Sequence, residues 1–238
     1  MIDVVFDGKS LSDFGAYIFP VDVDKRAERR YEEVEIEGRN GLYDDDLKTF
    51  RNLDEPVYAL IFTKDVEKNL SDFSEYISSR SGYKRLEDSL HPDVYLMARV
   101  NTDIDPIFTN NRNMAKVFLY FKRMPQRYLK IGDKPIQISA NSTVTIKNPT
   151  YKEARPLIKV TGLGYFYVNG AQYQVTQNAG NLIIDSDLMD CYEYVNGEWI
   201  VRNLHVNMPS EFPILKAGEN VIQTNALALE ITPRWWKS

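Results

Sequence analysis

Two Asn-Gly dipeptides in the second half of the chain restrict its fold more than any other feature. Asn169-Gly170 lies within YFYVNGAQYQV, and Asn196-Gly197 lies within CYEYVNGEWIV. Both central residues of a type I′ turn need positive φ, which Asn and Gly adopt readily, and the flanking tyrosines and valines favour strands. Each segment therefore predicts a β-hairpin.

Short alternating segments surround these two hairpins. STVTIK precedes them, and NVIQ and LALEIT follow them, with no helical periodicity in between. Strands at such short, even spacing are typical of a β-sandwich. In the last segment, Leu227, Leu229 and Ile231 form the expected inward face, and Pro233 ends the strand pairing.

Two adjacent tryptophans, Trp235 and Trp236, close this segment and are candidate interface residues. Two neighbouring exposed indoles would be costly on the surface of a soluble protein. We therefore expect at least one of them to pack against the neighbouring domain or a neighbouring subunit.

The first half of the chain opens with strand patterns. In YEEVEIEGRNG, Val34 and Ile36 point to one side of a strand, and Glu33, Glu35 and Glu37 point to the other. Gly38, Asn40 and Gly41 can supply the positive φ that a sharp reversal demands. The segment predicts a strand followed by a turn.

The first half also predicts one helix, over residues 66–80. Four apolar residues recur at helical spacing: Val66, Leu70, Phe73 and Ile77. They form a single apolar stripe, so this helix should lie on a sheet. Asp65 or Asn69 is expected to cap its start, and Gly82 to end it in the left-handed conformation.

A domain boundary is predicted within residues 124–135. MPQRYLKIGDKP contains two prolines and a glycine, with a helix-bearing half before it and short strands alone after it. We expect a mainly β protein of two domains, residues 1–127 with the one helix and residues 128–238 as the sandwich.

The charge balance argues against nucleic-acid binding through phosphates. The chain has 34 acidic and 29 basic residues, a formal charge of −5. Its first residues have no basic region followed by an apolar run, and no segment approaches the roughly 18 apolar residues of a membrane span. Neither a signal peptide nor a membrane anchor is expected.

Residue patterns that carry catalysis or metal binding are weak. His91 and His205 have no partner at metal-ligand spacing and are expected to be solvated, and Cys191 is expected to be buried. The acidic run at residues 44–46 lacks the pattern of a calcium loop, and no G-x-S-x-G motif is present. We predict no catalytic, cofactor or metal site.

Aromatic residues of the second half leave one alternative open, a carbohydrate-binding β-sandwich module. They are Tyr165, Phe166, Tyr167, Tyr173, Tyr192, Tyr194 and Trp199. Exposed aromatic rings on a sandwich can stack on sugars, whereas strand alternation turns about half of such residues toward the core.

Seven segments resemble, in order, the distal tail protein family of long-tailed (siphovirus) bacteriophages, mainly those of Gram-positive hosts. They are FGAYIF at Phe14–Phe19, VEIEGRNG at Val34–Gly41, VYLMARV, NPTYKEARPLIKVTGLG, NLIIDSDLMDCY, FPILKAGENVI and PRWW. Their order over nearly the whole chain makes the match specific.

The resemblance implies a structural hub of the baseplate and no enzyme. Proteins of this family form a hexameric ring of β-barrel-like N-terminal domains, from which galectin-like β-sandwiches project. The ring joins the tail tube protein to the tail-tip (tail-associated) protein at the distal end of the virion tail, and in some phages it carries receptor-binding proteins. Such proteins are made in the cytoplasm of the bacterial host, and DNA passes through the lumen without specific binding.

Physical reasoning suggests how such a ring would hold together. A closed ring uses a heterologous interface, and closure removes exposed strand edges. We expect the strands of the first half, with the hairpin that turns at Gly38 to Gly41, to supply the pairing, and Val34 and Ile36 are candidate interface residues. Six copies would carry about −30, since each has −5, which favours a net acidic lumen.

Overall fold

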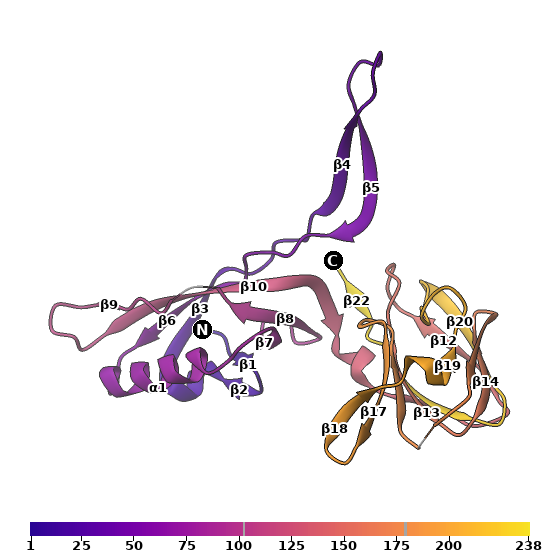
Figure 1. Ribbon diagram of the computed structural model, residues 1–238. Coiled ribbons are helices and arrows are strands. Elements are labelled where there is room, and N and C mark those ends of the chain that lie inside the picture. Colours follow the sequence, from indigo (N-terminus) through magenta and orange to yellow (C-terminus); the bar gives the residue numbers. More distant parts are fainter. Residues whose placement is uncertain (102, 179) are drawn as a thin grey trace. The chain divides into compact units, whose positions relative to one another are not determined.

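The computed structural model describes residues 1–101, 103–178 and 180–238. The chain divides into two compact units, Met1–Arg127 together with Ser238, and Tyr128–Lys237. Strands dominate both, and α1 (Val66–Ser78) is the single α-helix among the described residues, which confirms the mainly β fold (Figure 1).

The strands of the first unit form one large antiparallel sheet and a separate hairpin. They are β1 (Val4–Phe6), β2 (Lys9–Ser10), β3 (Ala16–Asp22), β4 (Arg29–Glu35), β5 (Leu42–Phe50), β6 (Val57–Phe62), β7 (Lys84–Asp88), β8 (Val94–Val100), β9 (Ile107–Phe108) and β10 (Ala115–Leu129), of which the last ends in the second unit. The large sheet has the order β2-β1-β7-β8-β10-β6-β3, and β9 also pairs with β10.

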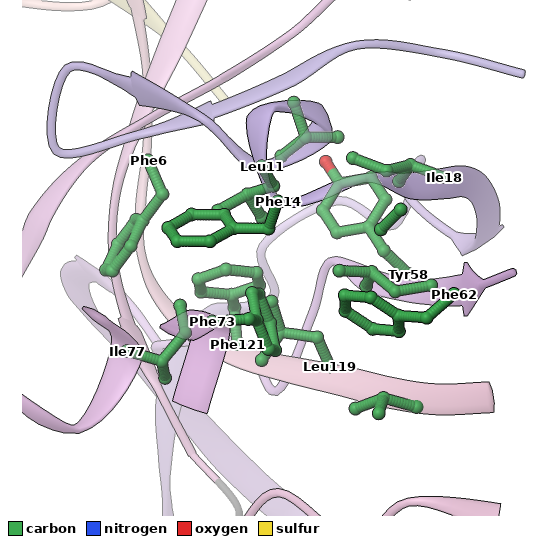
Figure 2. Close-up of a cluster of buried hydrophobic side chains, with 14 of the residues drawn as sticks. Phe6, Leu11, Phe14, Ile18, Tyr58, Phe62, Phe73, Ile77, Leu119 and Phe121 are labelled. Carbon is green, nitrogen blue, oxygen red and sulfur yellow. The ribbon is translucent and has the colours of Figure 1, made fainter. Parts of the chain in front are cut away.

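Helix α1 packs on one face of this sheet, as its apolar stripe predicts. Val66, Leu70, Phe73 and Ile77 are all buried and share a core with alternate residues of β6 and β10. Phe73 makes ring contacts with Phe14 and Phe62 at centroid distances of 5.7 and 5.6 Å (Figure 2). The stripe and the sheet thus bury each other's apolar face.

The ends of α1 differ from the prediction. Asp65 stands at the N-cap but its side chain makes no capping hydrogen bond, and the Asn69 amide donates to the Lys64 carbonyl at 2.8 Å. The helix ends at Ser78, capped by Ser79 in a right-handed conformation. Gly82 has the expected positive φ of 69° but lies beyond the helix end, so it does not cap it.

The second unit is a sandwich of two antiparallel sheets, with the orders β11-β21-β13-β16-β17-β18 and β12-β20-β14-β15-β19. The strands of these two sheets are β11 (Ile136–Ile138), β12 (Thr143–Asn148), β13 (Leu157–Thr161), β14 (Gly164–Val168), β15 (Ala171–Val175), β16 (Leu182–Asp185), β17 (Asp190–Val195), β18 (Glu198–Val201), β19 (Val206–Asn207), β20 (Gly218–Thr224) and β21 (Ala228–Thr232). The short strand β22 (Trp236–Lys237) lies outside both sheets. Alternate residues of both sheets meet in one core, among them Ile158 and Ile184 from the first and Phe166 and Ile222 from the second. The predicted sandwich is confirmed.

Both Asn-Gly dipeptides form two-residue turns. Asn169 and Gly170 have φ of 52° and 85° and connect β14 to β15, and Asn196 and Gly197 have φ of 52° and 92° and connect β17 to β18. Positive φ at both positions matches the twist of the flanking strands, which sets the registers Val168↔Ala171 and Val195↔Glu198.

Candidate assembly surfaces

Among the described residues, strands β4 and β5 form a hairpin that pairs with no other strand (Figure 1). We call residues 29–50 the arm. Every residue of β4 is exposed, so the arm has no buried face of its own. Gly38 and Gly41 have positive φ in its turn, whereas Asn40 does not. A lone two-stranded hairpin is marginally stable in water, so the arm gains most from binding a partner surface.

The arm exposes apolar side chains next to rows of carboxylates. Val34, Ile36 and Tyr43 have exposed fractions of 41%, 43% and 49%, and Val34 lies opposite Tyr43. Glu32 and Asp45 are direct cross-strand partners, and so are Glu33 and Asp44. Like charges at directly opposed positions destabilise a hairpin. A partner surface that covers the apolar side chains and carries cations would remove both the exposure of apolar area and the repulsion between the carboxylates.

The root of the arm is held by a buried ion pair. Arg123 Nη2 donates to Glu55 Oε1 at 2.9 Å, and the two side chains are only 2% and 1% exposed. The same Nη2 donates to the Lys25 carbonyl at 2.8 Å, and Glu55 Oε2 accepts from the Lys25 N–H at 3.2 Å. Burial lowers the pKa of Arg123, against the opposing effect of Glu55. Each charge has the partners that burial requires.

The segment that follows the arm is hydrogen-bonded to the same residue, Arg123 of β10. Leu53 donates its N–H to the Arg123 carbonyl at 3.1 Å and accepts from the Arg123 N–H at 2.8 Å. Lys25 precedes the arm and Leu53 follows it, so both ends of the arm are fixed to one residue of β10. The root is therefore a defined anchor.

His91 lies beside the segment that leads into the arm. Its Nδ1 is 3.0 Å from Asp88 Oδ1 and its Nε2 is 3.0 Å from Asp24 Oδ1. His91 lies at a turn as predicted and is partly exposed. Its two carboxylate partners were not predicted, because the fold brings Asp24 to it from far away in the sequence. Burial, and then the Asp88 carboxylate, raises the pKa of Tyr58, whose hydroxyl donates to Asp88 at 3.0 Å.

The sheet face opposite α1 carries a row of exposed aromatic and aliphatic residues. Cross-strand pairs place Tyr17 beside Ile61 and Phe19 beside Ala59, on the side away from the helix. Tyr17, Phe19, Tyr120 and Ile107 are all exposed. We call this the outer face. Strand β3 lies at the sheet edge, and an edge strand can accept a strand from another chain.

The closing tryptophans lie within the second unit. Trp235 is 4% exposed and belongs to the sandwich core. Its carbonyl accepts from the Leu129 N–H at 2.7 Å, and Gly132 fits beside it because a Cβ there would lie 2.5 Å from the Trp235 nitrogen. Trp236 is half-buried, and its Nε1 donates to the Glu153 carbonyl at 2.7 Å. Neither indole is fully exposed.

Asp185 and Arg234 form a second well-made ion pair. The two carboxylate oxygens accept from Arg234 Nη1 and Nη2 at 2.7 and 3.0 Å. Asp185 Oδ1 also accepts from the backbone of Asp187 at 3.0 Å, as expected for an aspartate at a strand end. Burial alone would raise the pKa of Asp185, but the hydrogen bonds and charge of Arg234 outweigh it and lower that pKa.

This lowered pKa predicts how the second unit responds to acid. The pair stabilises the fold above the ordinary pKa of an aspartate, and this contribution is lost as the pH falls through the depressed folded pKa. We expect Asp185→Asn to reduce the fall in unfolding free energy between about pH 7 and about pH 3. Urea unfolding at both pH values measures this change in unfolding free energy. Glu219→Gln, at an exposed position, is the control. If the unfolding free energies of Asp185→Asn and the wild type depended equally on pH, the stabilising role of the Asp185–Arg234 pair would be contradicted.

The side chains that could bind a metal ion are dispersed over the described parts of both units. Residues 1–101, 103–178 and 180–238 contain no group of three or more His, Cys, Asp and Glu residues placed to hold a metal ion. Cys191 is buried, and burial raises the pKa of its thiol to about 12. No helix in these ranges is long and apolar enough to cross a membrane.

Comparison with known proteins finds likeness in structure. No protein-family model and no curated protein matches the chain. The crystal structure of the SPP1 Dit (gp 19.1) protein, a paradigm of the hub adsorption apparatus in Gram-positive infecting phages, matches with a TM-score of 0.64 at 16% sequence identity, over 98% of each chain.

Two further structures match along the same length. A chain of the phage P2 baseplate in its activated conformation with Ca has a TM-score of 0.53 at 11% identity, over 97% of each chain. A chain of the phage p2 baseplate in its activated conformation with Sr has a TM-score of 0.52 at 10% identity, over 97% of each chain. The chain thus has the fold of phage hub and baseplate proteins, including both units.

Proposed function

We propose that this chain is a distal tail protein, a structural hub in the baseplate of a long-tailed phage with a Gram-positive host. The observation that carries the proposal is the likeness to the SPP1 Dit hub protein over 98% of both chains. A match confined to one unit would support only a shared domain. Here both the helix-bearing unit and the sandwich take part, in the same order along the chain.

The first unit of six copies closes into a ring, and the interface is heterologous. The apolar side of the arm, with Val34 and Ile36, contacts the neighbouring copy, and the edge strand β3 and the outer face supply surfaces of the kind it needs. A different surface at each side of a subunit lets every copy bind two neighbours, and closure leaves no arm unpaired.

The ring joins the tail tube protein to the tail-tip protein at the distal end of the tail. The sandwich units project from the ring and are available to receptor-binding proteins. DNA passes through the lumen without specific binding, which the net charge of −5 per copy supports. The role is structural and involves no turnover.

A change at the arm tests the ring. The double variant Val34→Asp, Ile36→Asp should be monomeric. Negative-stain imaging should show a six-fold ring for the wild type, and light scattering should give the mass of a monomer for the variant. Two desolvated carboxylates in an apolar contact would cost several kcal/mol at each interface. The two residues are exposed and outside the core of the first unit, so the free chain should keep its fold.

Glu33→Gln, on the opposite side of the same strand, is the matched control and should leave the ring intact. Circular dichroism of the double variant establishes that it is folded. A soluble hexamer from the Asp variant would refute the arm contact, and a wild-type protein that forms no ring with or without the tail tube protein would refute the hub assignment.

A further inference from the structure

The two Asn-Gly turns of the second unit are reactive groups as well as turns. Glycine has no side chain to shield its backbone nitrogen, so this nitrogen can attack the side-chain amide of a preceding asparagine. Asn169-Gly170 and Asn196-Gly197 both lie in the tetrapeptide YVNG, and all four residues are exposed. Neither local sequence nor exposure distinguishes the two sites, so their different surroundings must decide which of them reacts.

The Asn169 side chain is fixed by the neighbouring strand β20. Its Nδ2 donates to Asn220 Oδ1 at 2.8 Å, and its Oδ1 accepts from the Val221 N–H at 3.0 Å. Asn220 is fully buried and is itself held, because its Nδ2 donates to the Lys216 carbonyl at 2.9 Å. The Asn169 N–H also donates to the Val221 carbonyl at 2.9 Å. Both ends of the Asn169 amide are therefore occupied, and β20 holds the turn.

The Asn196 side chain has no such support. Among the residues that the structure describes, it makes no hydrogen bond. The backbones of the two turns are nearly the same, with φ of 52° at both asparagines. Strand β18, however, ends its sheet and pairs, among the described strands, with β17 alone (Figure 1). The turn at Asn196 therefore opens at lower cost than the turn at Asn169.

We propose that Asn196 is a site of spontaneous deamidation that loosens the β17–β18 hairpin, and that Asn169 is protected from the same reaction. When the turn opens, the Gly197 nitrogen attacks Asn196 Cγ. The new C–N bond closes a cyclic imide, the Cγ–Nδ2 bond breaks, and the proton of the attacking nitrogen leaves with Nδ2 as ammonia.

Water then opens the imide at one of its two carbonyl carbons. Cleavage at Cγ gives aspartate, and cleavage at the backbone carbonyl carbon of residue 196 gives isoaspartate. No group is oxidised or reduced, and water is the one co-reactant. Either product adds one negative charge to the formal −5 of the chain.

Isoaspartate also changes the hairpin. The chain then runs through Cβ and Cγ of residue 196, which adds one atom to the backbone of a two-residue turn. That turn sets the pairing of Tyr194 with Trp199. The Trp199 ring lies 4.9 Å from that of Tyr192 and 4.8 Å from that of Tyr194, between centroids, so a change of pairing separates rings that now touch. This edge of the second unit thus alters with the age of the protein, whether or not copies form a ring.

The test is storage of the full-length protein at mildly alkaline pH, with samples taken over time. A protease that cleaves after glutamate releases Asn196 between Glu193 and Glu198, and Asn169 in a separate fragment that follows Glu153. Mass spectrometry of these fragments gives the rate of conversion at each site. Asn196 should convert faster than Asn169 by about tenfold or more, since both hydrogen bonds of the Asn169 side chain must break before its carbonyl carbon is reached.

The matched control is the same chain unfolded in urea. Because both asparagines lie in YVNG, their rates should be nearly equal once the fold is removed. Equal rates in the folded protein, or a faster rate at Asn169, would overturn the proposal. It would also be overturned if Asn196 in the folded protein stayed unchanged over the time in which the unfolded chain converts.

Hydrogen exchange of the β18 amides tests the effect on the hairpin. Asn196→Asp carries the added charge on an ordinary backbone, and Asp-Gly suits the same kind of turn, so the fresh variant should exchange like the fresh wild type. Aged wild type in which isoaspartate has formed should exchange faster than both. If it exchanged at the same rate as the fresh variant, the loosening of the hairpin would be refuted.

Discussion

Replacing Glu55 with alanine should lower the unfolding free energy of the first unit by about 3–5 kcal/mol. The change leaves the Arg123 guanidinium, which is 2% exposed, without its carboxylate partner. It also removes the acceptor for the Lys25 N–H. The cost of an unpaired buried charge exceeds the net value of the pair itself, so replacing both partners, as in Glu55→Leu with Arg123→Met, should be less harmful than the single change.

Hydrogen exchange of the β6 and β10 amides in urea reports on the first unit separately from the second. The matched control is Glu67→Ala, which breaks the exposed Arg112–Glu67 pair, whose side chains are 59% and 72% exposed. Exposed pairs contribute about 0–1 kcal/mol, so this variant should behave like the wild type. Similar losses in Glu55→Ala and Glu67→Ala would show that the buried pair does not anchor the arm root.

Trp235→Ala should destabilise the second unit by about 3–5 kcal/mol, the usual cost of truncating a buried tryptophan. The indole lies in the sandwich core, and its backbone is fixed by Leu129 and fits against Gly132. Because the surrounding core has little room to collapse into the cavity left by the ring, we expect a destabilisation in the upper part of that range.

The amides of β13 and β16 report this loss by hydrogen exchange. Trp199→Ala removes a tryptophan that is 61% exposed, so its effect should stay within about 0.5 kcal/mol. If Trp235→Ala lost no more than Trp199→Ala, the burial of Trp235 in the sandwich core would be wrong.

Elements with strong local periodicity were predictable from the sequence. The stripe from Val66 to Ile77 predicts both a helix and the face that it buries, because side-chain direction follows from helical geometry. The sandwich follows from short alternating strands and two Asn-Gly turns in the same way. Alternation also separates the aromatic residues: Phe166 and Tyr173 stack in the core at 5.0 Å, while Tyr194 and Trp199 face outward.

The contacts that define the candidate surfaces were not predictable, because they join residues far apart in the chain. Glu55 and Arg123 are 68 positions apart, and His91 meets Asp24 across 67 positions. No local pattern encodes such a pairing. The one available signal was a charged residue within an otherwise apolar pattern, as Arg123 follows Val117, Leu119 and Phe121 on the inward side of β10. The predicted caps of α1 were wrong for a different reason, because a cap depends on the path of the chain outside the helix.

The opposed carboxylates of the arm bear on how free copies avoid one another before assembly. A newly made hairpin with exposed apolar residues and open edges is at risk of adding to an identical hairpin, which would give irregular aggregates in place of a closed ring. Glu32 opposite Asp45, and Glu33 opposite Asp44, give every copy the same dense negative charge. Two arms therefore repel each other at close range. The charge that weakens each hairpin also keeps free copies apart while they wait for a different kind of surface.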